Sequence, residues 1–137
     1  MPYIRDTRRV KYGIQNFRLT YDDLNFTSPD GTALKFPDTV GIGHYHYADI
    51  HGLRHGCAYP DYIICCKHPV NPYYIPFRAL TSAESTNLLA AGKTMAQTFL
   101  ANAATRLHPT EWSSGVAAGA AAYTMLVNGY VTTTEMY

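Results

Sequence analysis

Small residues recur at helical spacing near the end of the chain. At intervals of three and four, one helix face carries Gly115, Ala118, Gly119 and Ala122. Ser113 or Ser114 can cap this helix, and Asn128-Gly129 supplies a C-terminal stop. A helix face made of such small residues lets a backbone, a sheet or a flat ligand approach closely, because no large side chain is in the way.

A short apolar run, residues 87–91, precedes this helix and stops at Gly92. The run is too short for a confident helix, and the glycine after it favours a buried strand that ends in a tight turn. Both of its faces are apolar, which is typical of a central strand. Polar residues then lead to His108-Pro109. We therefore expect strand, turn, loop and helix in this order over residues 86–128.

Alternation predicts a strand over residues 36–47. One face would carry Val40, Ile42, His44 and His46, and the other Gly41, Gly43, Tyr45 and Tyr47. Residues 62–66 and 73–80 are further strand candidates, and Pro76 indicates an edge position or a bulge in the second.

Local signals organise the N-terminal part. Residues 1–20 suggest a strand pair, or a strand and a loop. Thr20, followed by two aspartates, predicts the start of a short helix. This helix must end before the turn sequence of residues 28–31, SPDG.

Charge is sparse for an isolated domain. Charged residues make up 15% of the 137 residues, where about a quarter is usual, so we expect much of the surface to be covered by a partner. The net charge is +1 without a basic cluster beyond Arg8-Arg9, which argues against nucleic acid as a partner. Residues 116–127 are too short and too weakly apolar to span a membrane. No apolar signal segment opens the chain, so we expect a cytoplasmic protein.

Histidines follow the strand of residues 36–47. His44, His46, Asp49, His51 and His55 are of the residue types that bind metals. Their spacing matches no familiar zinc motif, and histidine beside tyrosine on a half-buried strand commonly supplies hydrogen bonds. We expect no metal. The three cysteines make no disulfide framework and suit small buried side chains.

Four motifs occur in one order along the chain: YIRDTRR at residues 3–9, YIPFRAL at 74–80, NLLAAGK at 87–93 and ANAATRLHPTEWSSG at 101–115. Together they resemble the C-terminal end of FAD-dependent oxidoreductases with a glutathione-reductase-like two-domain flavin fold. That family's N-terminal strand-GxGxxG-helix, which holds the ADP half of FAD, is absent from the sequence. Gly41-x-Gly43 is the segment most similar to the GxGxxG motif, and no helix-like stretch follows it.

The resemblance implies a mixed α+β chain, an α/β fragment of the two-domain fold. Residues 1–80 would form a β-rich segment on the substrate side. Residues 81–137 would supply the final strand, the loop and the flavin-contacting helix of the FAD-binding domain. Another chain would complete the fold.

The resemblance also implies where FAD would bind. The turn at Gly92-Lys93 would meet the ribityl chain or the phosphates, and residues 111–115 would meet the pyrimidine side of the isoalloxazine ring. The cofactor-binding residues would thus be Gly92, Lys93, Glu111, Trp112, Ser113, Ser114 and Gly115. A helix N-terminus at this edge would stabilise the negative charge of the reduced ring. Alternatively, the two glycines serve only a turn and helix packing.

Catalysis would involve His108 and Arg106. A histidine on the reactive side of the flavin can exchange the substrate proton, since its pKa is ordinarily near neutrality. Both residues could instead anchor the loop through backbone carbonyls. The substrate pocket would include Tyr45, His46, His51, Tyr74 and Arg78. For Tyr45, His46 and His51 the alternative is structural hydrogen bonding, and for Arg78 it is a buried structural arginine.

We therefore expect a subunit or cleaved fragment of an FAD-dependent oxidoreductase that acts on a small-molecule substrate. It would form a hetero-oligomer with a second polypeptide carrying the dinucleotide-binding half. The alternative is a non-enzymatic structural or self-assembling protein that keeps the flavoenzyme scaffold. Twelve tyrosines suit the interfaces of either.

Overall fold

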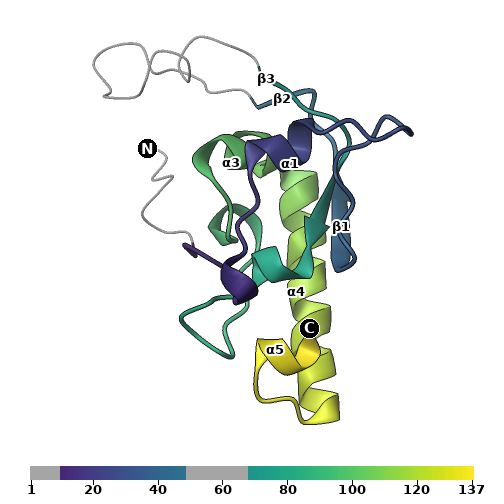
Figure 1. Cartoon of the computed structure of the whole chain (residues 1–137). Coiled ribbons are helices and arrows are strands. Elements are labelled where there is room, and N and C mark those ends of the chain that lie inside the picture. The colour runs from purple at the N-terminus through teal and green to yellow at the C-terminus, as the bar shows by residue number, and fades with distance from the viewer. Residues whose placement is uncertain (1–9, 49–67) are drawn as a thin grey trace.

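A 21-residue helix, α4 (His108–Asn128), runs through the molecule, and the strands and shorter helices pack beside it (Figure 1). The computed structural model describes residues 10–48 and 68–137. Besides α4, the helices are η1 (Ile14–Asn16), α1 (Tyr21–Asn25), η2 (Phe77–Leu80), η3 (Gly92–Thr94), α3 (Phe99–Thr105) and α5 (Thr133–Met136). The strands are β1 (Thr39–Gly43), β2 (Tyr47–Ala48), β3 (His68–Pro69) and β4 (Tyr73–Pro76). This mixture confirms the expected α+β class.

The strands form two small antiparallel pairs. β1 pairs with β4, with Ile42 opposite Tyr74 and Gly43 opposite Tyr73, and the register shifts between Thr39 and Gly41. β2 pairs with β3, where Ala48 lies opposite His68. The predicted strand of residues 36–47 is therefore two strands, and residues 44–46 lie between them.

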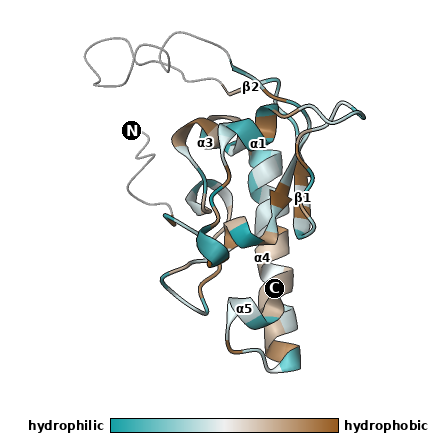
Figure 2. Ribbon diagram, viewed as in Figure 1, coloured by the Kyte–Doolittle hydropathy of each residue, from teal (hydrophilic) through white to brown (hydrophobic). Residues whose placement is uncertain are grey.

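The core lies where α1, α3 and β4 meet. Leu19, Leu24, Ile75, Leu80 and Met95 are buried there, together with alanines of α3. The hydropathy colouring shows apolar residues of β1 beside α4 (Figure 2), and these two elements are in contact. Core residues thus come from both sides of residue 80, and the division into segments 1–80 and 81–137 stays a prediction.

Several local predictions are confirmed. Thr20 caps α1 in a capping box with Asp23. The turn at residues 28–31 forms, and Gly31 adopts a φ of 76°. Gly129 ends α4 in the left-handed conformation, with a φ of 70°. Along β1, Val40 and Ile42 are exposed while the glycines beside them face inward.

The start of α4 was predicted wrongly. The helix begins at His108, five residues before Ser113, because Pro109 fits the first helical turn, where its missing N–H costs nothing. Ser113 and Ser114 are therefore not caps. Residues 111–115 lie within and beyond the first turn rather than at the terminus, and the free N–H groups belong to the residues that precede Glu111.

Three further predictions also differ from the structure. Residues 87–91 are not a buried strand: Leu88 is exposed, and a single bridge joins Leu89 to Thr81. The segment 73–80 is a strand only to Pro76 and continues as η2. The stretch before Arg106 is not a loop throughout, because it contains α3, which Thr98 caps.

Some predictions concern residues outside the described ranges. They are the strand of residues 62–66, the motif of residues 3–9, all three cysteines, Asp49, His51 and His55. Between residues 10 and 20 the structure contains η1 and a parallel bridge from Leu19 to Gln97, rather than a strand pair.

Candidate functional site

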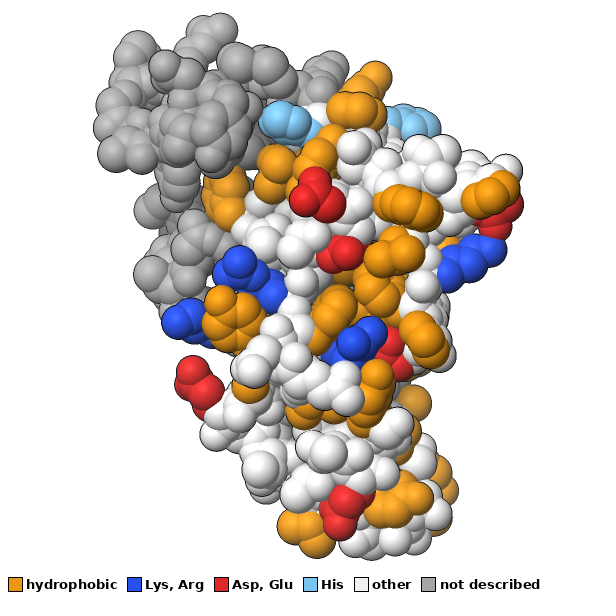
Figure 3. All heavy atoms as spheres, viewed as in Figure 1, with side chains coloured by type: hydrophobic (Ala, Val, Ile, Leu, Met, Phe, Trp, Pro, Cys, Tyr) orange, Lys and Arg blue, Asp and Glu red, His pale blue; other side chains and the backbone are white. Residues whose placement is uncertain are grey.

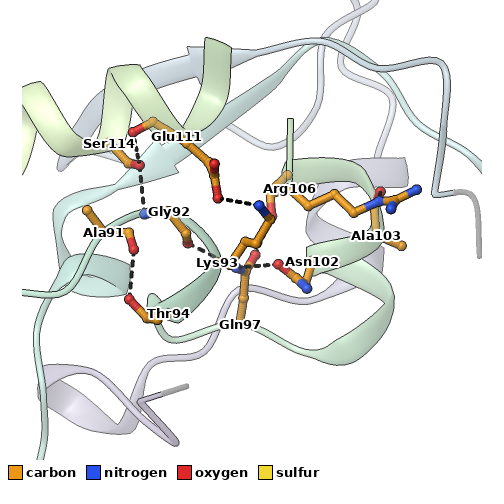
Figure 4. A network of polar contacts seen from close by, with 11 residues as sticks. Ala91, Gly92, Lys93, Thr94, Gln97, Asn102, Ala103, Arg106, Glu111 and Ser114 are labelled. Carbon is orange, nitrogen blue, oxygen red and sulfur yellow. Dashed lines mark hydrogen bonds and ion pairs between the residues drawn. The ribbon is translucent and has the colours of Figure 1, made fainter. Parts of the chain in front are cut away.

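The turn at Gly92 is fastened to the first turns of α4 (Figure 4). Gly92 is buried and adopts a φ of 61°. Its N–H donates to Ser114 Oγ at 2.9 Å, and this hydroxyl donates to the carbonyl of Glu111 at 3.0 Å. A Cβ on Gly92 would lie 3.3 Å from Glu111 Oε1. Both the backbone conformation and the approach of Glu111 therefore favour glycine here.

An ion pair crosses the same junction. Lys93 Nζ lies 3.1 Å from Glu111 Oε1, with both side chains partly exposed. Because water screens such a pair, it contributes little to stability. The ion pair does, however, hold Lys93 against α4, and Glu111 partly compensates the charge of Lys93.

Buried polar side chains hold the turn from its other side. Gln97 Nε2 donates to the carbonyl of Gly92 at 3.3 Å and to Asn102 Oδ1 at 3.1 Å, and Thr105 Oγ1 donates to Gln97 Oε1. The turn is thereby joined to α3 as well as to α4. Sequence reasoning missed these residues. Thr98 before the apolar run of residues 99–101 was the available signal of a helix start.

Tyr73 fixes the beginning of α4. Its hydroxyl lies 2.9 Å from Thr110 Oγ1 and donates to the carbonyl of Ala104 at 3.1 Å. The side chain is buried, and burial raises the pKa of Tyr73, although the hydrogen bond with Thr110 opposes this. Tyr73 therefore stays neutral and joins α3, β4 and α4. The sequence analysis selected its neighbour Tyr74 instead.

Close approach also explains the two glycines of β1. A Cβ on Gly41 would lie 2.8 Å from Ser113 Oγ, and one on Gly43 would lie 2.6 Å from the ring of Tyr73. They let the strand pack against α4 and β4. Gly41-x-Gly43 is thus a packing feature here, and the next element of the described chain is the strand β2.

Of the predicted cofactor residues, the structure joins four in one network: Gly92, Lys93, Glu111 and Ser114. Trp112 is 78% exposed, and a Cβ on Gly115 would meet no atom within 4 Å. Ser113 is half-buried beside Gly41.

The two predicted catalytic residues differ in their surroundings. His108 is exposed at the first position of α4. Arg106 caps α3 and donates from Nε to the carbonyl of Ala103 at 3.1 Å. This contact is the one expected of a loop anchor. Catalytic roles for both residues stay predictions.

The predicted substrate residues lie apart from this network in the described part of the chain. Arg78 is paired with Asp38, through Nε at 3.0 Å and Nη2 at 3.2 Å, and stacks on Phe17. His46 is exposed after β1 and contacts His44 edge to face. Tyr74 is half-buried under the ammonium group of Lys35. Tyr45 is half-buried, and His51 lies outside the described residues.

A groove of about 760 Å³ lies along α4, between β1 and α5. This volume is within the usual range for small-molecule sites. Two predicted cofactor residues, Trp112 and Ser113, lie in its wall. The full lining is Asp38, Thr39, Val40, Phe77, Trp112, Ser113, Val116, Ala117, Ala120, Ala121, Thr124, Met136 and Tyr137.

Within residues 10–48 and 68–137, no three His, Cys, Asp or Glu side chains gather as a metal site would require. No helix there has the length and apolar character needed to cross a membrane.

The fold and the fastened turn define a mixed α+β protein in which a glycine turn meets the start of a long helix of small residues. Comparison with protein families gives the class a name. The model for FAD dependent oxidoreductases matches residues 1–134, so this chain belongs to the FAD-dependent oxidoreductase family. Searches of curated proteins and of solved structures gave no significant match.

FAD is the cofactor of this family, and the residues present fit one part of it. Gly92 leaves no room for a side chain against Glu111, whereas Gly115 and Gly119 open onto free space. The α4 N-terminus offers N–H groups without helical partners. The sequence contains no GxGxxG segment, so the fit concerns the ring side of FAD and not its ADP half.

Proposed function

We propose that this chain is a subunit or cleaved fragment of an FAD-dependent oxidoreductase that cradles the pyrimidine edge of the isoalloxazine ring. The observation that carries the proposal is the turn at Gly92, which hydrogen bonds through Ser114 fasten to α4. Such a junction fixes a turn and a helix start relative to each other. Fixed backbone groups can stabilise charge without reorganising.

FAD, when bound, supplies the two-electron chemistry by exchanging a hydride with the substrate. The chain's own groups supply binding and electrostatics. The positive end of the α4 dipole favours negative charge near His108. The open surface at Gly115 leaves space for a flat ring, and Lys93 offers a cation toward the phosphates or the ribityl chain.

We assign proton exchange to His108. It is exposed at the start of α4, where the substrate can reach it, and histidine changes charge near neutral pH. Arg106 would position the loop before His108 through its bond to Ala103. The groove along α4 is our candidate for part of the pocket for a small-molecule substrate.

The proposal includes a second polypeptide. The ADP half of FAD needs a strand-GxGxxG-helix unit, and we place this unit on a partner in a cytoplasmic hetero-oligomer. The low charged fraction of the chain and the exposed apolar side chains of α4 support a covered surface.

A second candidate function is a non-enzymatic assembly protein that keeps this scaffold. The observation that favours it is the series of large apolar side chains exposed on α4, including Trp112, Tyr123 and Leu126. Bound flavin separates the two functions, because only the oxidoreductase needs it.

The experiment is the Gly115→Val substitution in the native complex. The added side chain would occupy the space proposed for the ring, so we expect loss of bound flavin or a lower reduction potential, with the complex still assembled. Asn128→Val, at the other end of α4, is the control for placing a β-branched residue in this helix. Unchanged flavin content and potential in Gly115→Val would show that the cradle is misplaced.

A further inference from the structure

The groove along α4 has an apolar and aromatic lining. Phe77, Trp112 and Tyr137 contribute rings to it, and Asp38 is the one charged residue among those that line it. Figure 3 shows the Lys and Arg side chains of the visible face above the level of α5, and mainly hydrophobic or uncharged side chains over α5 and the end of α4. The groove therefore favours an occupant with apolar surface.

The carboxylate of Asp38 is already occupied. Its Oδ2 accepts hydrogen bonds from the backbone N–H and from Nε of Arg78, both at 3.0 Å, and its Oδ1 accepts one from Nη2 at 3.2 Å. The Asp38 side chain is only 10% exposed. The groove thus presents no unpaired charge. An ionised group on a ligand would lose water there without gaining a counter-ion, which is unfavourable.

A cationic ligand meets a second obstacle. The guanidinium group of Arg78 lies 5.6 Å from the ring centroid of Tyr137. Tyr137 therefore already has a cation beside it, and the charge of Arg78 would repel another. Arg78 does not itself line the groove, so it offers no direct partner to an anionic ligand.

One hydroxyl of the groove is free to bind a ligand. Thr39 Oγ1 donates to the carbonyl of Phe36 at 2.7 Å, and Thr124 Oγ1 donates to the carbonyl of Ala120 at 2.9 Å. Ser113 is half-buried, and its hydroxyl has no hydrogen-bond partner within the described chain. A hydroxyl can both donate and accept. Ser113 can therefore hold an uncharged oxygen at a fixed place in an apolar groove.

We propose that the groove binds an uncharged aromatic substrate whose hydroxyl or carbonyl oxygen forms a hydrogen bond with Ser113. This inference rests on the proposed function, in which the groove is part of the substrate pocket. The rings of the substrate would lie on Ala117, Ala120 and Ala121, whose small side chains let a flat molecule contact α4 closely. An apolar pocket with a single well-placed polar group orients its ligand in this way.

The test compares three probes that share a biphenyl group: biphenyl-4-methanol, biphenyl-4-carboxylate and biphenyl-4-methylammonium. Equilibrium dialysis measures the dissociation constant of each probe for the native assembly, which is purified through the tagged full-length chain. We expect the alcohol to bind about tenfold or more tightly than either ion at pH 7, because the ions would lose water without gaining a counter-ion. An alcohol that binds no more tightly than an ion would overturn the proposal.

Two variants locate the binding of the alcohol. Ala120→Phe places a ring inside the groove and should weaken binding by about tenfold or more, since it removes the contacts of the probe with α4. Ala122→Phe is the matched control, because Ala122 is exposed on the same helix and does not line the groove. Circular dichroism shows whether both variants fold. Unchanged binding in a folded Ala120→Phe variant would mean that the groove is not the site.

Ser113→Ala tests the hydrogen bond. It should weaken binding of biphenyl-4-methanol by about threefold to tenfold, the scale of one neutral hydrogen bond, and should leave binding of unsubstituted biphenyl unchanged. Equal effects on the two probes, or no effect on either, would contradict the role of Ser113.

The flavin content of the same preparations separates this inference from the proposed function. An assembly that contains flavin but prefers an ionic probe would refute the substrate class and leave the oxidoreductase assignment in place. An assembly without flavin whose binding of the alcohol depends on Ser113 would refute the oxidoreductase assignment and support the ligand class of the groove.

Discussion

Gly92 combines two constraints that act on a single residue, a left-handed backbone and the nearby Glu111. In Gly92→Ala the backbone conformation costs about 1–2 kcal/mol, and crowding against Glu111 adds to it. We expect a lower free energy of unfolding, measured by thermal or denaturant melting. Gly31→Ala is the matched control, since Gly31 also has a positive φ but free space around it. Equal losses in both variants would mean that the contact with Glu111 is unimportant.

His108 is the residue on which the proposed chemistry depends. Asparagine keeps some hydrogen bonding but does not titrate near neutral pH, so His108→Asn should lower kcat by about 10²-fold or more, the usual scale for a lost general acid or base. Flavin content should remain. Full turnover in His108→Asn would make His108 a loop anchor.

Among the secondary-structure elements, those with local signals were predictable from the sequence. Thr20 with Asp23 marks the start of α1, and Gly129 marks the end of α4, because capping depends on a few adjacent residues. The alternation of exposed and half-buried residues along β1 could also be predicted from the sequence. For the site, the sequence indicated Gly92, Lys93, Glu111 and Ser114, which the structure joins in one network.

Elements that depend on distant partners were not predictable. Residues 87–91 have the composition of a buried strand, but in the described chain they form only an isolated bridge, between Leu89 and Thr81, and Leu88 stays exposed. The roles of Tyr73 and Gln97 follow from the packing of α3 against the turn and α4. Local sequence patterns do not predict such contacts, because the contacts join residues that are far apart in sequence.

The short helix α5 carries a testable pH effect. Glu135 accepts hydrogen bonds from the N–H groups of Thr132 and Val131 and from the Thr132 hydroxyl, and these bonds lower its pKa below the ordinary value of 4.5. The capping box should thus be intact above pH 4.5 and be lost as the pH falls through the lowered pKa. An NMR titration of the Glu135 side chain measures this. Titration at or above 4.5 would contradict the cap.

At the scale of the whole molecule, the surroundings of α4 support our proposal that this chain binds a partner. One side of the helix packs on the core, the groove runs along it, and Tyr123 and Leu126 remain exposed. With 15% charged residues, the surface has few groups that would keep so apolar a helix in water. In our proposal the dinucleotide-binding polypeptide covers this surface.

The flavin content of the native assembly tests the central claim most directly. The tagged full-length chain would be purified from its own cells, its flavin released by heat and by protease, and the flavin and the co-purifying polypeptides identified by absorbance and mass spectrometry. We predict FAD together with a polypeptide that contains a GxGxxG segment. An assembly that releases no flavin after both treatments would contradict the assignment of this chain to a working oxidoreductase.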